Sequence, residues 1–321
     1  MSRRALITGV TGQDGSYLAD FLLDRDYEVF GLIRRTSKPN TENIKHLADN
    51  PNFHVLYGDL TDQGSINRAI LEATPDEVYN LAAQSFVGGS WDYPVSTGDI
   101  TGLGPLRILE ALRQFNPKAR FYQASSSEMF GDQGGLLNEE SVLAPRSPYG
   151  SAKAFAHYTT VNYRESYGMH ASCGILFNHE SPRRGIEFVT RKITDGVAKI
   201  KLGQQKKLKL GNIEAKRDWG DARDYVYAMW LMLQQDEPDN YVIATGHTHS
   251  IKVLLDLAFR QAGMEWEKYV ETDKSFFRPA EINVLIGDSS KARAKLGWEP
   301  LTTFQQMVKD MLDADLERNK L

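Results

Sequence analysis

The stretch Arg4-Ala-Leu-Ile-Thr8-Gly9-Val-Thr11-Gly12-Gln13-Asp14-Gly15 decides the fold of this 321-residue chain. Residues 4–8 form a short apolar run typical of a buried strand, and a glycine-rich turn separates it from a helical pattern over residues 16–25. Glycines at such a junction let backbone N–H groups and the helix N-terminus approach a dinucleotide pyrophosphate. The spacing Gly-x-x-Gly-x-x-Gly departs from the usual Gly-x-Gly-x-x-Gly, so the turn alone is a weak signal.

Around this turn, short β-branched or aromatic runs alternate with helical patterns as far as residue 177. Strands are expected at residues 27–33, 53–57, 77–81, 120–124 and 172–177, and a further helix at 103–115. Strands that are almost continuously apolar and separated by helices indicate a parallel sheet covered on both faces. The sequence therefore predicts an α/β fold with a doubly wound, Rossmann-type parallel sheet.

Beyond Asn178 this regularity fades, although a helix is expected at 221–235, a strand at 241–244 and another helix at 251–262. We expect the segment at about 221–246 to return to the sheet. Residues 1–177 and about 221–246 would then form a dinucleotide-binding domain. Residues 178–220 and 247–321 would form a smaller C-terminal lobe that binds the substrate.

Composition restricts the partners and the compartment. With 38 Lys and Arg against 42 Asp and Glu, the net charge of −4 gives no reason to expect nucleic acid or an anionic membrane as partner. The apolar stretch behind the basic start ends at Thr11, too early for a signal peptide, and no run approaches the roughly 18 residues of a membrane span. Cys173, the single cysteine, lies in an apolar run, which favours a buried thiol in a cytoplasmic protein.

The residues after the second expected strand predict which dinucleotide binds. Enzymes that use NAD place an acidic residue there for the ribose 2′-hydroxyl, whereas this chain has Arg34-Arg35-Thr36-Ser37. Guanidinium groups and hydroxyls suit a 2′-phosphate, so NADP is preferred over NAD. The alternative is a solvated arginine pair on a surface loop.

Two further segments follow strands at the edge where a doubly wound sheet binds its ligands. Asp59-Leu60 comes after the third expected strand and Leu81-Ala82-Ala83 after the fourth. Small residues there would let a cofactor lie against the backbone. Simple tight packing would explain the same residues.

Tyr149-Gly-Ser-Ala-Lys153 carries the candidate reaction centre. Ser147 and Pro148 are typical of a helix N-cap and first position, so Tyr149 and Lys153 fall four residues apart on one helical face. A lysine ammonium and a positively charged nicotinamide would lower the pKa of the tyrosine toward a value useful for deprotonating a sugar hydroxyl. Chance helical spacing is the alternative, and the position behind the glycine turn argues against it.

Ser125-Ser126-Ser127-Glu128 follows the strand expected at 120–124, at the same edge of the sheet. Ser126 could hydrogen-bond the oxygen that is oxidised. Glu128 could act as a base on a carbon made acidic by the neighbouring ketone. A carboxylate on a surface loop is the alternative for Glu128.

Several motifs together resemble the GDP-mannose 4,6-dehydratase family of extended short-chain dehydrogenases/reductases, and the resemblance spans nearly the whole chain. The motifs that carry it are Gly9-Val-Thr-Gly-Gln-Asp-Gly-Ser-Tyr-Leu18, Asn80-Leu-Ala-Ala-Gln-Ser-Phe-Val87, Ser127-Glu-Met-Phe-Gly131, Tyr149-Gly-Ser-Ala-Lys153, Ile175-Leu-Phe-Asn-His-Glu-Ser-Pro-Arg-Arg-Gly185, Ala215-Lys-Arg-Asp-Trp-Gly220, Asp224-Tyr-Val226 and Phe276-Phe-Arg-Pro-Ala-Glu281.

The resemblance implies a redox cycle in which bound NADP takes hydride from C4 of GDP-mannose, water leaves across C5 and C6, and the hydride returns to C6. It makes Tyr149 the base at the C4 hydroxyl, with Lys153 supporting it and holding the nicotinamide ribose. Glu128 would remove the C5 proton and help the C6 hydroxyl depart. The family commonly has threonine at Ser126, and because the hydroxyl is retained we expect function to persist.

To the binding residues described above, the resemblance adds His179 and Arg184 at the cofactor and Asn178, Lys192, Arg217, Arg278 and Glu281 at the substrate; no metal is expected. The residues expected at the cofactor are Gly9, Thr11, Gly12, Gln13, Asp14, Gly15, Arg34, Arg35, Thr36, Ser37, Asp59, Leu60, Leu81, Ala82, Ala83, Ser85, Lys153, His179 and Arg184. Those expected at the substrate are Ser85, Ser126, Glu128, Asn178, Lys192, Arg217, Arg278 and Glu281. A packed loop histidine is the alternative for His179, and ordinary surface ion pairs are the alternative for the substrate-side charges.

Two other functions fit parts of the pattern. A related sugar-nucleotide reductase or epimerase shares Tyr149 and Lys153 but has no need of a base at C5. A cofactor-sensing protein without catalysis has no reason to combine Tyr149, Lys153, Ser126 and Glu128. In tetrameric members of the family the loop at 34–43 reaches a neighbouring subunit's cofactor site, so a homotetramer is expected, with a dimer as the alternative.

Overall fold

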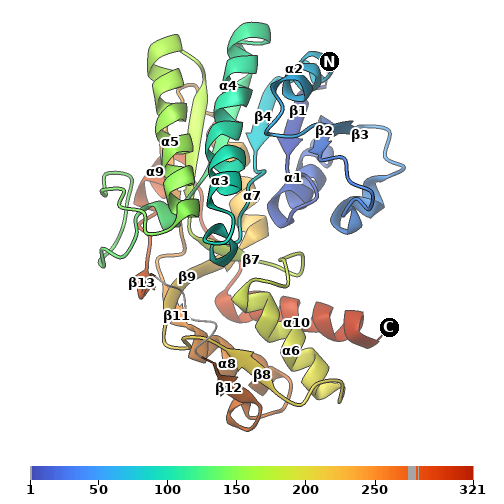
Figure 1. The fold of residues 1–321 in the computed structure, drawn as a ribbon, viewed down its shortest axis with the longest axis vertical. Coiled ribbons are helices and arrows are strands. Elements are labelled where there is room, and N and C mark those ends of the chain that lie inside the picture. The colour runs from blue at the N-terminus through green and yellow to red at the C-terminus, as the bar shows by residue number, and fades with distance from the viewer. Residues whose placement is uncertain (1, 274–279, 281, 321) are drawn as a thin grey trace.

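The structure, a computed structural model, describes residues 2–273, 280 and 282–320 (Figure 1). Its central sheet has seven parallel strands in the order β10-β6-β5-β4-β1-β2-β3. The order reverses between β1 and β4, where a doubly wound sheet opens a ligand crevice. The strands are β1 (Arg4–Thr8), β2 (Glu28–Ile33), β3 (Phe53–Tyr57), β4 (Glu77–Asn80), β5 (Arg120–Ser126), β6 (Ala171–Leu176) and β10 (Asn240–Ile243).

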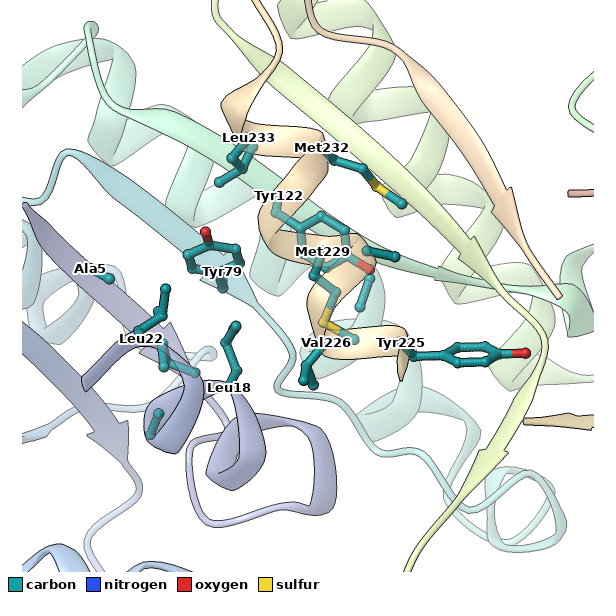
Figure 2. Close-up of a cluster of buried hydrophobic side chains, with 14 of the residues drawn as sticks. Ala5, Leu18, Leu22, Tyr79, Tyr122, Tyr225, Val226, Met229, Met232 and Leu233 are labelled. Carbon is teal, nitrogen blue, oxygen red and sulfur yellow. The ribbon is translucent and has the colours of Figure 1, made fainter. Parts of the chain in front are cut away.

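Helices cover both faces of this sheet, because successive strand residues point to opposite sides. Ala5 and Ile7 of β1 pack toward α1 (Gln13–Leu23) and α7 (Ala222–Gln234), whereas Leu6 packs toward α2 (Gln63–Ala73) and α4 (Gly104–Phe115). Figure 2 shows the first of these cores, where Leu18, Leu22, Val226, Met229, Met232 and Leu233 surround Tyr79 and Tyr122. The predicted doubly wound α/β sheet is thus confirmed.

Two predicted boundaries were wrong in ways that matter for function. The first helix begins at Gln13 rather than residue 16, because Gly12 is its N-cap and the glycine turn merges into the first helical turn. The strand predicted at 120–124 continues to Ser126, so Ser125 and Ser126 pair with Ile175 and Leu176 of β6. The strand therefore holds both serines at the carboxyl edge of the sheet.

A smaller lobe lies below the sheet in Figure 1, where α6 (Val189–Lys201), α8 (Ile251–Gln261) and α10 (Phe304–Lys320) share an apolar core. Two small sheets accompany it, one built around β9 and one formed by β8 and β12. Their strands are β7 (Asn178–Glu180), β8 (Leu208–Leu210), β9 (Lys216–Asp221), β11 (Thr248–Ser250), β12 (Val270–Thr272) and β13 (Val284–Leu285).

The remaining elements are short, apart from one long helix. Helix α5 (Pro148–Tyr167) contacts α4 and β5, and α9 (Ser290–Leu296) contacts β10. Among the helices of the described ranges, none combines the length and apolar character that a bilayer-spanning segment needs. The other elements are η1 (Glu42–Leu47), η2 (Gly88–Ser90), α3 (Pro94–Thr97), the π-helical η3 (Gly98–Leu103), η4 (Ser127–Met129) and η5 (Trp266–Lys268).

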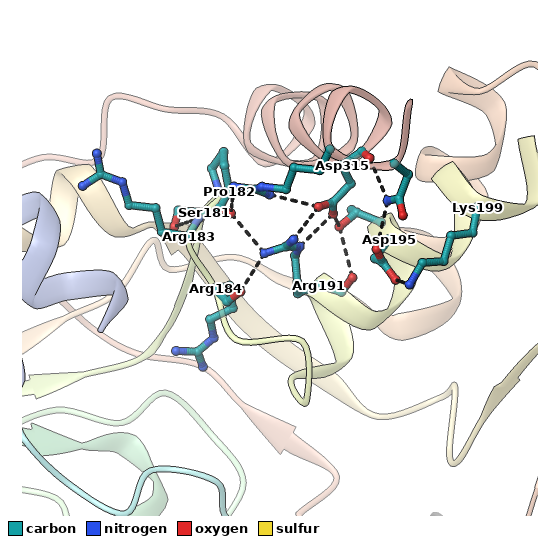
Figure 3. Close-up of polar contacts among 11 residues, drawn as sticks. Ser181, Pro182, Arg183, Arg184, Arg191, Asp195, Lys199 and Asp315 are labelled. Carbon is teal, nitrogen blue, oxygen red and sulfur yellow. Dashed lines mark hydrogen bonds and ion pairs between the residues drawn. The ribbon is translucent and has the colours of Figure 1, made fainter. Parts of the chain in front are cut away.

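A polar cluster fixes the segment that joins the two parts of the chain (Figure 3). Arg191 of α6 forms a bidentate ion pair with the buried Asp315 of α10, with N···O distances of 2.7 and 2.9 Å. The same guanidinium donates to the carbonyls of Pro182 and Arg184, at 3.1 and 2.9 Å. Thr194 also donates to Asp315, at 2.7 Å, and so helps to hold the carboxylate that orients Arg191. Because Arg191 in turn binds the two carbonyls, the segment after β7 has a fixed path.

The glycine turn allows a direct test of local packing. Gly9 has a φ of 70°, and a Cβ there would lie 2.9 Å from the Cα of Ala82, whereas Gly134 has the same φ and nothing within 4 Å. We expect Gly9→Ala to lower the free energy of unfolding by about 2 to 4 kcal/mol, because strain and collision add. Gly134→Ala should lower it by about 1 kcal/mol from strain alone. Urea unfolding measures both changes, and equal losses would show that the contact with Ala82 carries no energy.

Candidate active site

A cleft of about 390 Å³ lies at the carboxyl ends of β1, β4 and β5. The turn after β1, the segment after β4 and the end of β5 form one wall, and residues of β7, α6 and β9 form the other. The cleft therefore occupies the point where the strand order reverses, as expected for a doubly wound sheet.

The glycine turn forms one end of this cleft. Gly9, Gly12, Gln13, Asp14 and Gly15 line it, and Gly12 begins α1 without a side-chain cap. A Cβ at Gly15 would lie 2.3 Å from the carbonyl oxygen of Gly9, so only glycine permits this close return of the chain. An uncapped helix N-terminus behind a glycine turn fits the pyrophosphate of a dinucleotide.

Thr11 was also expected at the cofactor, but it does not line the cleft. Its carbonyl accepts a hydrogen bond from Asn43 Nδ2 at 3.0 Å, which ties the turn to η1. The structure thus gives Thr11 a contact within the protein.

Asp14 and His179 contact each other, although both were expected at the cofactor. His179 Nε2 lies 2.7 Å from Asp14 Oδ2, and its Nδ1 lies 2.7 Å from the carbonyl oxygen of Phe177. Gln13 reinforces this contact by donating to the carbonyl of His179 at 3.0 Å, and the imidazole stacks on Tyr225 with 4.6 Å between ring centroids. The packed-histidine alternative therefore describes His179 well, even though its side chain lines the cleft.

Burial and charge act in opposite directions on this pair. Burial lowers the pKa of His179, but the charge of Asp14 and its hydrogen bond outweigh burial, and the pKa is raised above 6.5. Burial raises the pKa of Asp14, but the same partner holds it below 3.8. Both shifts favour the charged forms of the two side chains, so the contact is an ion pair wherever His179 carries its proton.

The residues expected at the 2′-phosphate lie outside this cleft. Arg34, Arg35, Thr36 and Ser37 follow β2 and are solvent-exposed. Their surface position is compatible with both the 2′-phosphate hypothesis and a solvated arginine pair.

The segments after β3 and β4 separate into cofactor-facing and packing residues. Leu81, Ala83 and Ser85 line the cleft. Ala82 packs against Gly9, Asp59 accepts hydrogen bonds from the backbone and hydroxyl of Thr61 at 2.9 and 2.8 Å, and Leu60 is buried. For Ala82, Asp59 and Leu60 the structure thus favours the packing alternative.

The start of α5 brings the candidate reaction centre into the cleft. Ser147 caps this helix by accepting from the N–H of Gly150 at 3.0 Å, and Pro148 is the first helical residue, as predicted. Tyr149 and Lys153 both line the cleft and are buried. Lys153 Nζ lies 5.8 Å from the Tyr149 ring centroid and donates to the carbonyl of Ala124 at 2.6 Å.

Ser126 and Glu128 meet this helix from the end of β5. Ser126 Oγ accepts from the N–H of Glu128 at 3.2 Å, which fixes the turn η4, and both side chains are buried at the cleft. A Cβ at Gly150 would lie 2.7 Å from the carbonyl oxygen of Glu128, so glycine lets α5 approach η4 this closely. The four residues expected at the reaction centre therefore line one cleft.

In the protein alone, without the positively charged nicotinamide of the sequence-based expectation, the pKa of Tyr149 is not lowered. Burial raises it to about 12, and the hydrogen bond with Ser126 opposes burial only in part. Burial also lowers the pKa of Lys153 to about 8, because the charged ammonium is disfavoured away from water. Lys153 by itself does not offset the cost of burying a phenolate, so the second positive charge that the sequence analysis expects, that of the nicotinamide, is needed to favour it.

Comparison with known proteins identifies the family. The sequence profile described as GDP-mannose 4,6 dehydratase matches residues 6–311. The chain belongs to this family.

The similarity extends over almost the whole chain. GDP-mannose 4,6 dehydratase 1 of Arabidopsis thaliana is 53% identical over 98% of this chain and 90% of its own length, and the human GDP-mannose 4,6 dehydratase is 48% identical over 98% and 91%. Among solved structures, a UDP-glucose 4-epimerase of Thermus thermophilus in complex with NAD superposes with a TM-score of 0.84 at 28% identity, covering 97% of this chain and 98% of the epimerase.

In this member of the dehydratase family, several positions expected at the substrate lie on the opposite wall. Asn178, Lys192 and Arg217 line the cleft, and burial lowers the pKa of Lys192. Arg217 is buried and donates to the carbonyl of Lys216 at 2.8 Å. The other two expected positions, Arg278 and Glu281, lie outside the described residues.

Arg184, expected at the cofactor, also lines the cleft. Its Nε lies 3.1 Å from Glu180 Oε2, and its guanidinium lies 3.6 Å from the ring centroid of Phe188. Glu180 and Phe188 both line the cleft, and the sequence analysis did not identify either of them.

Among the residues that the structure describes, no group of three or more His, Cys, Asp or Glu is placed to hold a metal ion.

A buried polar ladder beneath the cleft was also missed. Thr8 Oγ1 donates to Asn80 Oδ1 at 2.7 Å and accepts from the N–H groups of Leu81 and Ala82, each at 3.1 Å. Asn80 in turn donates to Gln123 at 2.8 Å. The sequence does place these three polar side chains in adjacent apolar strands. Because buried polar groups require partners, this pattern could have predicted that the three side chains bind one another.

The Asp14–His179 pair makes stability depend on pH in a definite direction. The folded pKa of His179 is raised and that of Asp14 is lowered, so the contribution of the pair to the free energy of unfolding should be complete between about pH 4 and 6.5. This contribution should fall as pH rises through the raised pKa of His179. It should also fall as pH drops through the lowered pKa of Asp14.

His179→Gln should therefore lower the free energy of unfolding by about 2 kcal/mol between about pH 4 and 6.5, and by less at higher pH. The measurement is the difference in unfolding free energy between wild type and variant as a function of pH, which cancels the other titrating groups. A difference that does not change with pH would contradict the ion pair.

Proposed function

We propose that the protein converts GDP-mannose to GDP-4-dehydro-6-deoxy-mannose by oxidation at C4, elimination of water across C5 and C6, and reduction at C6. The carrying observation is the presence of Glu128 in the same cleft as Ser126, Tyr149 and Lys153. A tyrosine and lysine serve oxidation alone, whereas elimination needs a second base. A bound nicotinamide dinucleotide supplies the hydride acceptor and donor.

Tyr149 would remove the proton of the C4 hydroxyl while Ser126 holds the same oxygen. The pKa of Tyr149, about 12 in the protein alone, must fall for this role. Lys153 lies one helical turn away, and the positive charge of an oxidised nicotinamide in the cleft favours the phenolate. The buried site strengthens that attraction because little water screens it.

Glu128 would act after the ketone has formed at C4. The ketone makes the C5 proton acidic, so a carboxylate beside it can remove that proton, and the C6 hydroxyl leaves as water when it receives a proton. The backbone N–H of Glu128 donates to Ser126 Oγ, which fixes Glu128 two residues from the hydroxyl that would hold the ketone oxygen. One turn of the chain therefore supports both the binding of the ketone oxygen and the removal of the C5 proton.

NADP is our proposal for the cofactor. The glycine turn and the uncapped α1 fit the pyrophosphate of either nicotinamide dinucleotide. Preference for NADP is supported by Arg34 and Arg35, which follow β2 with no acidic residue in the tetrapeptide Arg34-Arg35-Thr36-Ser37.

The smaller lobe would bind the nucleotide part of the substrate. Lys192 and Arg217 face the cleft and suit the diphosphate, and Asn178 lies between them and the reaction centre in sequence. We assign Arg278 to the diphosphate and Glu281 to ribose hydroxyls by family resemblance. We also propose a homo-oligomer, a tetramer or a dimer, in which the exposed loop at 34–43 meets a neighbouring subunit.

Glu128→Gln tests the assignment most directly. We expect turnover of GDP-mannose to fall by about 10² to 10⁴, because general base catalysis at C5 is lost. Oxidation at C4 should persist, so reduced cofactor should form on mixing and the 4-keto sugar should retain its water. Mass spectrometry of the product and nicotinamide absorbance measure the two steps.

Glu187→Gln is the matched control, since Glu187 is an exposed carboxylate on the same cleft, and it should retain activity. Dehydration that survives Glu128→Gln at the wild-type rate would refute Glu128 as the base at C5. Turnover of GDP-mannose by the wild type without loss of water would favour a reductase or epimerase. A wild-type protein that binds NADP but forms no 4-keto product would favour a cofactor-sensing protein.

The cofactor preference is tested at the loop after β2. Arg34→Ala and Arg35→Ala should each raise the Kd for NADP about tenfold or more, because a charge-assisted hydrogen bond to phosphate is lost. The Kd for NAD, which lacks the phosphate, is the internal control and should not change. Titration by calorimetry measures both, and equal changes for the two cofactors would refute a 2′-phosphate contact.

A further inference from the structure

Two phenylalanines from different parts of the chain meet at the rim of the cleft. Phe86 belongs to the loop between β4 and η2, and Phe188 is the N-cap of α6 in the smaller lobe. Their ring centroids lie 6.1 Å apart with an interplanar angle of 84°, an edge-to-face contact. Both rings line the cleft, and Phe86 keeps 39% of its surface exposed, so the pair lies between the cleft and solvent.

The ring of Phe86 is held from behind by its own loop. A Cβ at Gly88 would lie 3.0 Å from this ring and a Cβ at Gly89 would lie 3.1 Å from it. The ring therefore rests directly on the backbone of η2, with no side chain between them. The missing side chains of Gly88 and Gly89 thus provide the space that the Phe86 ring occupies.

The ring of Phe188 is held by a separate set of contacts. The guanidinium of Arg184 lies 3.6 Å from its centroid, and Arg184 pairs with the buried carboxylate of Glu180 at 3.1 Å. Glu180 also accepts a hydrogen bond from Thr190, in the first turn of α6. Each ring is therefore positioned independently, and the two meet only across the cleft.

We propose that Phe86 and Phe188 form an aromatic bridge that covers the reacting sugar and retains the dehydrated intermediate until the hydride returns. This inference rests on the proposed function. Ser85, adjacent to Phe86, lines the same cleft as Ser126 and Glu128, and we place the bridge over the sugar that these residues would bind.

The balance of the reaction shows why retention is needed. GDP-mannose gives a hydride from C4 to the oxidised cofactor and a proton from its C4 hydroxyl, and then loses water across C5 and C6. The result is an unsaturated ketone beside a reduced cofactor. Product forms only when that hydride reaches C6 and a proton reaches C5 of the same molecule, so each escaping ketone leaves one cofactor reduced.

The test measures reduced cofactor left per product formed. Wild type, Phe86→Ala and Phe188→Ala, each loaded with NADP, are mixed with GDP-mannose, and nicotinamide absorbance is compared with product mass. We expect the ratio to rise about tenfold in either variant, a change that corresponds to the usual strength of an aromatic pair. The double variant should resemble the single ones, because each removes the same contact.

Tyr167→Ala is the matched control. It removes an exposed ring from the edge-to-face pair of Tyr163 and Tyr167, which lies at the C-terminal end of α5 and outside the cleft. The ratio should stay at the wild-type value. Phe86→Leu, which keeps apolar volume at the rim, should give an intermediate ratio and guards against a variant that fails to fold.

A wild-type ratio in folded, NADP-binding Phe86→Ala and Phe188→Ala would overturn the bridge, even if KM rises. Should one alanine variant fail to fold, the other decides, since the bridge needs both rings. Failure of the proposed function is distinct, because wild type would then give no 4-dehydro product at all.

Discussion

The buried contact between Asp14 and His179 is the constraint on which the site depends. It joins the first turn of α1, which begins the cofactor wall, to β7, which begins the opposite wall. Because β7 pairs with β9, the same contact also sets the position of Arg217 on the far side of the cleft. Both ring nitrogens of His179 face acceptors, so the imidazole carries its proton and the pair retains its attraction in a dry environment.

The catalytic wall depends on a second close approach, between α5 and the end of β5. Lys153 reaches back to the carbonyl of Ala124, and the missing side chain at Gly150 lets the helix lie against the backbone of Glu128. These contacts put a phenol, a hydroxyl and a carboxylate within one buried volume. The same burial raises the pKa of Tyr149 to about 12, away from the values useful for proton transfer, and lowers that of Lys153 to about 8, so ligand charge must complete the site.

Local patterns in the sequence were enough to predict much of this arrangement. The glycine turn, the apolar strands and the Ser147-Pro148 helix start act over a few residues, and each was found within two residues of its predicted place or, for the start of α1, within three. The packing of Ala82 on Gly9 and the aromatic pair of Phe86 and Phe188 were not predictable in this way. They join segments far apart in the chain, and a single sequence carries no distances between such segments.

The sequence by itself determined the sheet type, the edge where ligands bind and the identity of Tyr149, Lys153, Ser126 and Glu128 as reaction candidates, because periodicity and turn chemistry are local properties of the chain. The tertiary structure decided which candidates face the cleft and which face one another. Asp14 and His179 lie 165 residues apart, and only folding makes them partners. Burial is likewise a property of the whole fold, which is why the protonation of Tyr149 could not be predicted from its neighbours in the sequence.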